Sequence, residues 1–479
     1  MMRKVLIISL LSLKLSAFSQ EEAFKSFLAD SVMEHAAVSF LIMESDSGKT
    51  VFEYNAGRSL IPASVMKLVT TSSALELLGP EHTFKTCMGY TGKITRLFKI
   101  LEGDIIIKGG GDPALGSENF EEHYAGFTDK WVEELKKLKI KEVTGRIITD
   151  DSYFDYLPVP AKWLWEDAGN YYGAGAYGLS LFDNTYEIHL SISADSSQLL
   201  ITGITPAECR FEFSNWLVAA GTADEGYVFA APYSTNGWLA GTIPSNLKDF
   251  VLKASIADPP LIMAKLMEQK LREAGISVKG SPSTVRLLQS PVKAEVKNLA
   301  ETESPSLDRI IEILNHESVN LYAEHLVKEI GKVYRKSGST EKGIQCINEF
   351  LTLSGINTDG LFMEDGSGLS PLNAINARGM VSLLHFMKTR GKHFDEFYSS
   401  LPEAGKEGTL KNRFTDQVFE SNLRAKSGSM TRVRSYAGYF TATSGREMIF
   451  CIIVNNFEGA HGKIISHIEE ILKEAVLKN

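Results

Sequence analysis

The stretch Pro62-Ala63-Ser64-Val65-Met66-Lys67 indicates the fold of this chain, because it places a serine and a lysine three residues apart at the start of a predicted helix. Apolar residues recur with helical spacing as far as Leu78, and Gly79-Pro80 predicts the end of that helix. Positions i and i+3 share one face of a helix, so the Lys67 amine can reach the Ser64 hydroxyl. A serine becomes a nucleophile when an adjacent base takes its proton, and a partly desolvated lysine can be that base.

Two further elements follow in chain order. Ser318-Val319-Asn320 opens a helical pattern that is predicted to stop near Gly331, and Lys426-Ser427-Gly428-Ser429 leads into a strand-like segment over 436–440. Each pattern also has decoys, since Ser-x-x-Lys recurs at 245–248, 290–293 and 339–342, and Lys336-Ser337-Gly338-Ser339 copies the third element. That copy lies between two helical patterns with no strand after it, so we predict a loop there. The informative feature is the ordered trio, with each member in its expected local structure.

The trio resembles that of the serine acyltransferases that react with penicillin. Flanking segments narrow the resemblance to the D-alanyl-D-alanine carboxypeptidase/endopeptidase family, the class C low-molecular-mass penicillin-binding proteins. The segments that carry it, spread over almost the whole chain, are 103–105, 109–115, 150–154, 171–176, 183–184, 365–370, 404–405 and 408–410. Ser427 and Ser429 stand where threonine is usual in the family, which keeps each hydroxyl and loses a methyl group.

The resemblance implies an α+β fold. A penicillin-binding transpeptidase/β-lactamase-like catalytic domain, an antiparallel sheet with helices, would carry a large inserted region of two nested, β-rich domains. The segment between Ser64 and Ser318 is indeed too long for a loop. The domain boundaries expected are a signal peptide over 1–19, a catalytic domain over 20–88 and 298–479, an inserted domain over 89–175 and 252–297, and a nested domain over 176–251.

Strand patterns at the two ends of the chain suggest how the catalytic sheet is built. Residues 36–42 and 50–54 read as two strands joined by a turn in which Gly48 can take a positive φ. Residues 436–443 and 448–455 read as a second hairpin, followed by a closing helix with an apolar stripe from Ile464 to Val476. We expect one antiparallel sheet made from both termini, with the Ser64 and Ser318 helices packed on it and the Lys426 strand at its edge.

Composition limits the possible partners and location. The 479 residues carry a net charge of −9, which argues against nucleic acid and against a cationic membrane-binding face. Arg3 and Lys4, an apolar run and Ala17-Phe18-Ser19 predict a signal peptide cleaved before Gln20, hence an exported, periplasmic protein. No stretch is long and apolar enough for a transmembrane anchor.

The four cysteines, Cys87, Cys209, Cys346 and Cys451, form no Cys-x-x-Cys pair, and buried free thiols are the favoured interpretation, with disulfides the alternative.

The resemblance assigns roles to the trio. Ser64 would attack the carbonyl of a D-alanyl peptide bond, with Lys67 as base. Ser318 would pass a proton to the leaving amine, and Asn320 would hold Lys67 and the substrate amide. Lys426 and the Ser427 hydroxyl would bind the terminal carboxylate, Gly428 would let the strand backbone approach closely, and the N–H groups of Ser64 and Ser429 would form the oxyanion hole. The simpler alternative for Ser64, Ser318 and Asn320 is helix capping.

A specificity pocket is a further expectation from the resemblance. In the family the position of Met430, together with an acidic residue from the inserted domain, lines a pocket for the side chain of the third residue of the peptide. The acidic candidates are Asp150 and Asp151, which follow the strand-like segment 146–149. The alternative is that Asp150-Asp151-Ser152 only forms a turn or a helix cap.

These observations predict an exported serine DD-peptidase that cleaves peptidoglycan peptides ending in D-Ala-D-Ala, or D-Ala cross-links, and is acylated by β-lactams. No metal motif or cofactor motif is found: His316 and His325 do not form His-Glu-x-x-His, and no Gly-x-Ser-x-Gly elbow is present. The alternatives are a serine β-lactamase and a catalytically silent cell-wall binding protein. The balance of carboxypeptidase and endopeptidase activity and the oligomeric state stay open.

Overall fold

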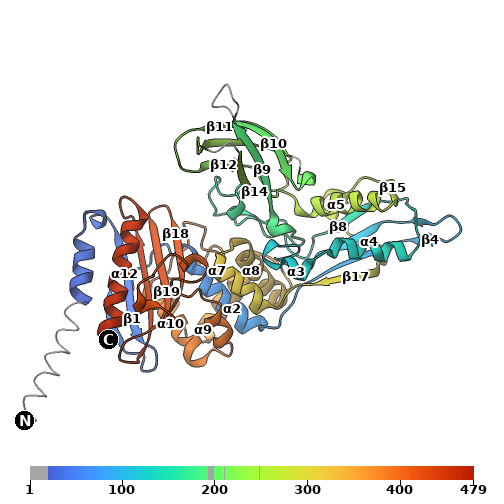
Figure 1. Ribbon diagram of the computed structural model, residues 1–479. Coiled ribbons are helices and arrows are strands. Elements are labelled where there is room, and N and C mark those ends of the chain that lie inside the picture. The colour runs from blue at the N-terminus through green and yellow to red at the C-terminus, as the bar shows by residue number, and fades with distance from the viewer. Residues whose placement is uncertain (1–19, 193–198, 210, 247–248) are drawn as a thin grey trace, which may run out of the picture. The chain divides into compact units, whose positions relative to one another are not determined.

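The computed structural model describes residues 20–479 apart from 193–198, 210 and 247–248 (Figure 1). The predicted signal peptide over 1–19, and Lys248 of one Ser-x-x-Lys decoy, lie outside these residues. The chain divides into two compact units. Unit 1 comprises the described part of Met1–Pro80 with Ile311–Val319 and Ile344–Asn479, and unit 2 comprises Glu81–Ile310 and Asn320–Gly343. The nested boundaries expected from the sequence are finer than this division and stay predictions.

Unit 1 is built on an antiparallel sheet from both ends of the chain, as expected. Its strand order is β18-β19-β20-β1-β2. The strands are β1 (Ala37–Glu44), β2 (Thr50–Tyr54), β18 (Leu423–Met430), β19 (Val433–Thr441) and β20 (Glu447–Asn455). Gly48 and Gly445 have φ values of 66° and 85° in the two predicted turns, a conformation that glycine adopts without strain. The strand that carries Lys426, β18, lies at the sheet edge, which confirms the prediction.

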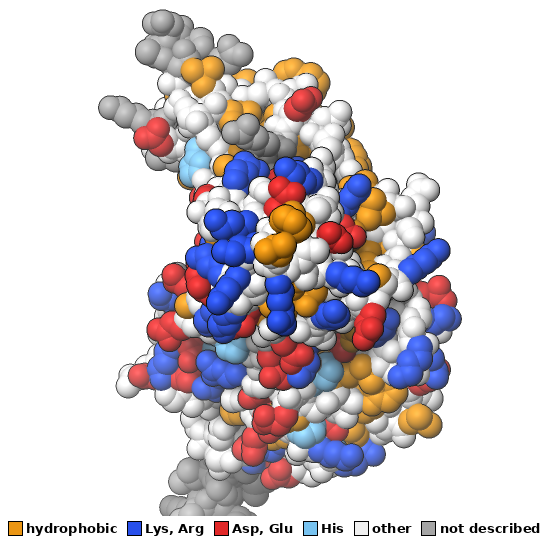
Figure 2. All heavy atoms as spheres, turned by 90° about the vertical axis from the view of Figure 1, so that its right-hand side faces the viewer, with side chains coloured by type: hydrophobic (Ala, Val, Ile, Leu, Met, Phe, Trp, Pro, Cys, Tyr) orange, Lys and Arg blue, Asp and Glu red, His pale blue; other side chains and the backbone are white. Residues whose placement is uncertain are grey.

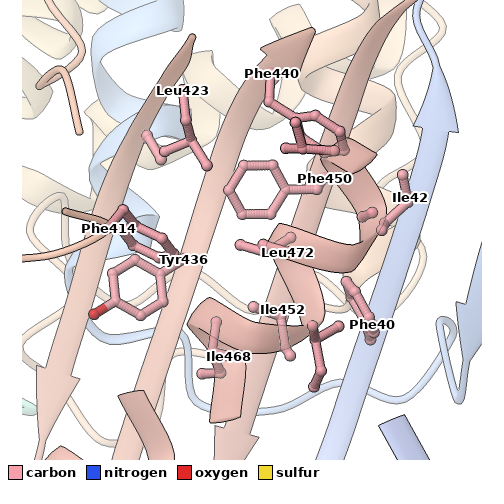
Figure 3. Close-up of a cluster of buried hydrophobic side chains, with 14 of the residues drawn as sticks. Phe40, Ile42, Phe414, Leu423, Tyr436, Phe440, Phe450, Ile452, Ile468 and Leu472 are labelled. Atoms are coloured by element: carbon pink, nitrogen blue, oxygen red, sulfur yellow. The ribbon is translucent and has the colours of Figure 1, made fainter. Parts of the chain in front are cut away.

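The sheet of unit 1 is covered on both faces. Strands β19 and β20 are buried at nearly every position, without the alternation of a half-exposed strand. Helix α12 (His461–Lys478) lies on one face, and Figure 3 shows Ile468 and Leu472 directed toward Phe40, Tyr436, Phe450 and Ile452. Helix α10 (Ala377–Arg390) packs on β20 and β1. The predicted apolar stripe of α12 is therefore the stripe that closes the core.

The helix at Ser64 begins and ends where the sequence predicts. A 3₁₀ turn, η2 (Ala63–Met66), leads directly into α2 (Lys67–Leu78), and Gly79 caps the helix with a φ of 84°. The other helices that lie partly or wholly in unit 1 are α7 (Leu307–Glu317), α9 (Thr340–Leu353) and α11 (Phe394–Ser399). Residues 20–29 are helical as well.

The helix after Ser318 differs from its prediction in two ways. Helix α8 (Asn320–Arg335) does not stop near Gly331, and its contacts place it in unit 2. Gly331 is needed for close packing, because a Cβ there would lie 2.8 Å from both the Gly343 nitrogen and the Ser337 oxygen. The copied tetrapeptide 336–339 forms the loop between α8 and α9, as predicted.

Unit 2 contains two mixed sheets around α4 (Phe127–Lys137) and α5 (Pro259–Glu273). The first has the order β16-β8-β6-β3-β17 and the second β15-β7-β5-β4. The elements of this part are β3 (Lys85–Tyr90), β4 (Lys93–Thr95), β5 (Ile100–Glu102), β6 (Ile105–Lys108), α3 (Glu121–Tyr124), β7 (Glu142–Val143), β8 (Ile147–Asp150), β15 (Ser277–Val278), β16 (Ser283–Thr284), α6 (Val285–Leu288) and β17 (Lys297–Glu303).

The middle of unit 2 is rich in strands, as the resemblance implies for the nested domain expected over 176–251. One sheet has the order β10-β9-β14 and another β11-β13-β12. These strands are β9 (Thr185–Ile192), β10 (Leu199–Thr205), β11 (Glu212–Ala219), β12 (Glu225–Phe229), β13 (Asn236–Ile243) and β14 (Asp249–Ser255). An α+β architecture with β-rich inserted structure is therefore confirmed.

The structure also bears on the expectations about the cysteines and about membrane-spanning helices. All four cysteines are free, and Cys209, Cys346 and Cys451 are buried as expected. Cys87, on β3, is only partly buried, and its sulfur lies 3.6 Å from Glu301 Oε2. In the described part of the chain, no helix combines the length and the apolar character that crossing a membrane requires.

Candidate active site

Ser64 lies in the η2 turn, at the junction where the chain enters α2, and its side chain is partly exposed. The preceding residue, Ala63, has a φ of 49°, a left-handed conformation that costs a non-glycine residue about 1 kcal/mol or more. Gly368 packs against this turn so closely that a Cβ on it would lie 2.0 Å from the Ala63 oxygen. The surrounding chain therefore holds Ser64 in a fixed, strained turn.

Lys67 reaches Ser64 in the way that the helical spacing predicts. Its Nζ donates to Ser64 Oγ over 2.9 Å and to the Ser367 carbonyl over 2.8 Å. The side chain is completely buried. A desolvated amine within hydrogen-bonding distance of a serine hydroxyl is the arrangement that activates a serine nucleophile.

Lys426 and Ser318 form a second amine–hydroxyl pair in unit 1. Lys426 Nζ donates to Ser318 Oγ over 2.9 Å and to the Ser427 carbonyl over 3.0 Å, and the lysine is completely buried. Burial, followed by the charges of Lys67 and Arg434, holds the pKa of Lys426 well below its usual value. Because two neighbouring ammonium groups repel, the site favours a state in which one amine is neutral.

Strand β18 comes close to the nucleophile at Gly428. A Cβ on Gly428 would lie 2.5 Å from the Pro62 oxygen and 3.1 Å from the Ser64 nitrogen. Ser435, on the neighbouring β19, donates from Oγ to the same Pro62 carbonyl over 2.5 Å. Position 428 therefore needs glycine, as expected. The segment that comes close to it is the η2 turn.

The remaining residues of β18 differ in exposure. Ser427 is buried, and its hydroxyl donates to Thr409 Oγ1 over 2.9 Å. Ser429 is exposed and Met430 is partly exposed. Ser429 pairs with Arg434 in the antiparallel register of β18 and β19. A hydroxyl, a buried amine and an exposed strand edge next to Ser64 provide the donors that a carboxylate end of a substrate would need.

The loop 365–370 contributes residues to which the sequence reasoning assigned no role. Ser367 accepts from Lys67 through its carbonyl, and the Asp365 carboxylate accepts from the nitrogens of Gly368 (2.7 Å) and Ser370 (2.6 Å). Thr70 on α2 donates to the Gly366 carbonyl over 2.6 Å. The resemblance included this segment, but no spacing rule shows that its backbone, rather than a side chain, holds Lys67.

Three of the expected site residues belong to unit 2. Asn320 is the first residue of α8, and its Nδ2 donates to the Tyr172 carbonyl over 2.8 Å. Asp150 ends β8 and accepts from the Ser152 nitrogen (3.1 Å) and hydroxyl (2.6 Å). Asp151 is only 2% exposed and has one carboxylate oxygen with no hydrogen-bond partner in the described structure. Unit 1 therefore brings together Ser64, Lys67, Ser318 and Lys426 with β18, whereas Asn320, Asp150 and Asp151 have their described contacts within unit 2.

Comparisons with known proteins identify the family that this arrangement indicates. The family model described as "D-Ala-D-Ala carboxypeptidase 3 (S13) family" matches residues 20–474. The D-alanyl-D-alanine carboxypeptidase of Actinomadura sp. (strain R39) is 29% identical over 452 residues, which cover 91% of this chain and 81% of the relative. The chain belongs to the D-Ala-D-Ala carboxypeptidase 3 (S13) family, and the family recognised from the motifs is confirmed.

Solved structures agree with the fold. Penicillin-binding protein 4 (DacB) from Haemophilus influenzae has a TM-score of 0.79 at 22% identity, covering 92% of this chain and 97% of the other. A second structure of that protein, in complex with a β-lactam, has a TM-score of 0.74 at 21% identity, with the same coverage of both chains. The predicted fold class is thus confirmed, and the chain is a serine-type D-Ala-D-Ala peptidase of the penicillin-binding class.

Proposed function

We propose that Ser64 is the nucleophile of this peptidase, and that its substrates are peptidoglycan stem peptides ending in D-Ala-D-Ala or joined through D-Ala cross-links. The observation that carries the proposal is the buried Lys67 amine, 2.9 Å from Ser64 Oγ, beside the second buried amine of Lys426. Two lysines close together and out of water are costly, and such a cost is usual where it serves a reaction.

In the proposed acylation step, Ser64 Oγ bonds to the carbonyl carbon of the penultimate D-alanine while Lys67 takes the hydroxyl proton. The carbon–nitrogen bond then breaks as Ser318, hydrogen-bonded to Lys426, passes its proton to the leaving amine. Ser318 regains the proton that Lys67 took from Ser64, so Lys67 is neutral again before water enters. Lys426 and Ser427 hold the terminal carboxylate, which sets the substrate register. Water then attacks the ester and releases the shortened peptide, with Lys67 accepting the water proton and Ser64 regaining its own.

Backbone N–H groups of Ser64 and Ser429 would stabilise the tetrahedral oxyanion, an effect worth about 3 kcal/mol for each donor. The close approach of β18 to η2 at Gly428 supports this assignment, since it brings the two segments that would supply the donors together. Asn320 is proposed to orient Lys67 and the substrate amide, as in the family. Inhibition by β-lactams follows from the same chemistry, and a structural relative is known in complex with a β-lactam.

Covalent labelling with a fluorescent penicillin tests the nucleophile. We expect labelling of the wild-type protein and none of Ser64→Ala, with the same thermal unfolding midpoint for both. Ser290→Ala and Ser339→Ala, from Ser-x-x-Lys decoys, are the matched controls and should label normally. Labelling that persists in Ser64→Ala would refute the assignment, and an unlabelled wild-type protein would favour a silent cell-wall binding protein.

Two further measurements define the activity. Turnover of nitrocefin, as opposed to a single slow acylation, would identify a β-lactamase. Mass spectrometry of muropeptides before and after digestion would show loss of a terminal D-alanine for a carboxypeptidase and opened cross-links for an endopeptidase.

We also propose that the protein is exported and that its leader is removed near Ser19/Gln20. The basic, apolar and small-residue pattern over 1–19 supports this, as does a substrate that lies outside the cytoplasm. N-terminal sequencing of the protein from a periplasmic fraction should begin at Gln20. An uncleaved N-terminus in that fraction would contradict the proposal.

A further inference from the structure

The hairpin formed by β4 and β5 exposes two large apolar side chains at its turn. Residues 96–99 make the turn, and within it Leu97 is 85% exposed and Phe98 69% exposed. Strand β4 is also the edge of its sheet. Neither side chain contributes to the core of unit 2, so the folded unit gains nothing from their apolar character.

Basic residues surround this turn. The turn itself and the segment after α4 contribute four exposed cations: Arg96, Lys99, Lys139 and Lys141. The two segments are joined directly, because the Lys141 nitrogen donates to the Lys99 carbonyl over 2.7 Å. Among the residues that the structure describes, none of these four cations forms an ion pair. Figure 2 looks onto this end of unit 2 and shows a hydrophobic area with many Lys and Arg side chains, and some Asp and Glu side chains, around it.

The neighbouring acidic residues do not cancel this charge. Glu133 and Glu134 are paired with Lys136 and Lys137 at 2.7 and 2.5 Å, and Glu142 is paired with Lys279 at 3.1 Å. Lys93 lies opposite Glu102 across the hairpin. The four unpaired cations are therefore a local surplus, in a chain whose net charge is −9.

Two of these lysines occupy backbone positions that do not favour lysine. Lys99 and Lys139 have φ values of 58° and 57°, a left-handed conformation that glycine and asparagine accept at lower cost. The backbone conformation of these turns therefore does not explain why lysine occupies positions 99 and 139.

We propose that this hairpin tip, defined as residues 96–99 with Lys139 and Lys141, docks reversibly on an anionic lipid bilayer. Leu97 and Phe98 would enter the boundary between headgroups and acyl chains, while the surrounding cations pair with lipid phosphates. An apolar group or a basic patch alone gives marginal membrane binding, and the two together give useful affinity. Such docking would hold the enzyme at the membrane surface without a spanning helix.

Vesicle flotation of the mature protein tests the proposal. Vesicles of phosphatidylglycerol and phosphatidylethanolamine in equal parts should bind the protein about tenfold or more tightly than phosphatidylcholine vesicles, and high salt should weaken that binding. Leu97→Ser/Phe98→Ser should reduce binding about tenfold or more. Leu353→Ser is the matched control, because Leu353 is 88% exposed on α9.

A charge series completes the test. Lys99→Gln/Lys139→Gln/Lys141→Gln should weaken anionic binding about tenfold or more, whereas Lys25→Gln/Lys49→Gln/Lys411→Gln, at exposed lysines of unit 1, should not. Penicillin labelling at the wild-type rate shows that each variant is folded. Equal binding to neutral vesicles, or full binding by the Leu97/Phe98 variant, would overturn the proposal. So would retention on isolated sacculi without binding to vesicles, which would assign the tip to another polyanion.

Discussion

Lys426 and Lys336 stand in identical tetrapeptides, yet the structure places them in different environments. Lys426 is completely buried on β18 and donates to Ser318, whereas Lys336 is exposed in the loop after α8, with its Nζ 3.5 Å from the Val333 carbonyl. Lys426→Ala should lower kcat/KM for a D-Ala-D-Ala peptide by roughly 100-fold or more, because a charged substrate end would lose its buried partner. Lys336→Ala should leave kcat/KM at the wild-type value. Equal losses in the two variants would contradict the assignment.

Asp151 allows a test of how a buried carboxyl affects stability. Burial, with the charge of Asp258 adding to it, raises the pKa of Asp151 to about 6 from 3.8. The folded protein therefore binds more protons than the unfolded chain between these values, so Asp151 lowers stability as pH rises through that window, and the full cost is present above about pH 6.

Asp151→Asn should accordingly raise the free energy of unfolding by about 2 kcal/mol at pH 8 and change it little at pH 3. Thermal unfolding midpoints of the two proteins across this pH range give the measurement. A gain that is the same at both pH values would show that ionisation of Asp151 is not the cause.

At the scale of single elements, the contact between β18 and η2 is the feature most sensitive to a small change. Gly428→Ala would place a methyl group 2.5 Å from the Pro62 oxygen and 2.3 Å from Ser435 Oγ, so the strand must move away from Ser64. A displacement of this kind should slow acylation by penicillin by about 100-fold. Gly462→Ala is the control, because a Cβ at position 462 meets nothing within 4 Å, and it should acylate at the wild-type rate.

The same elements show what the sequence could and could not predict. Periodicity and turn residues predicted α2, α12 and the β1–β2 and β19–β20 hairpins correctly. Each has an apolar pattern, and a glycine marks the end of α2 and the turn of each hairpin. The prediction that the helix ends near Gly331 was wrong. Gly331 allows the backbone of Ser337 and Gly343 to pack closely against the helix, and in the sequence such a glycine cannot be distinguished from one that ends a helix. The hydrogen bond from Lys67 to the Ser367 carbonyl was not predicted either. Every residue has a backbone carbonyl, and only the tertiary structure determines which one lies next to Lys67.

At the scale of the whole molecule, averages over the chain conceal local features. A net charge of −9 argued against a cationic membrane-binding face, but it does not show that the acidic residues beside the hairpin tip form ion pairs with other lysines. The trio of motifs also does not coincide with one compact unit. Ser318 belongs to unit 1 and Asn320, two residues later, to unit 2, so a single short motif spans the division.

Of the residues expected from the sequence to line a specificity pocket, Met430 belongs to unit 1 and the two aspartates to unit 2. Asp150 is the better candidate for binding a ligand, because it is partly exposed and lines a cavity of about 430 Å³ together with Lys108, Gly109 and Tyr153, whereas Asp151 is buried. The structure also shows the simpler role, an Asp150 carboxylate that accepts from the Ser152 backbone. Asparagine can accept the same hydrogen bond, so Asp150→Asn removes the charge and keeps the turn.

If Asp150 pairs with the free amine of a diaminopimelyl side chain, Asp150→Asn should lower kcat/KM for diaminopimelyl peptides by about tenfold. Acylation by a simple penicillin, which lacks that amine, should keep its wild-type rate. Asp150→Ala separates the two roles, because it removes both the charge and the hydrogen bond to Ser152. Should Asp150→Asn behave as wild type on both substrates while Asp150→Ala loses thermal stability, Asp150 only forms the turn and the pocket must be sought elsewhere.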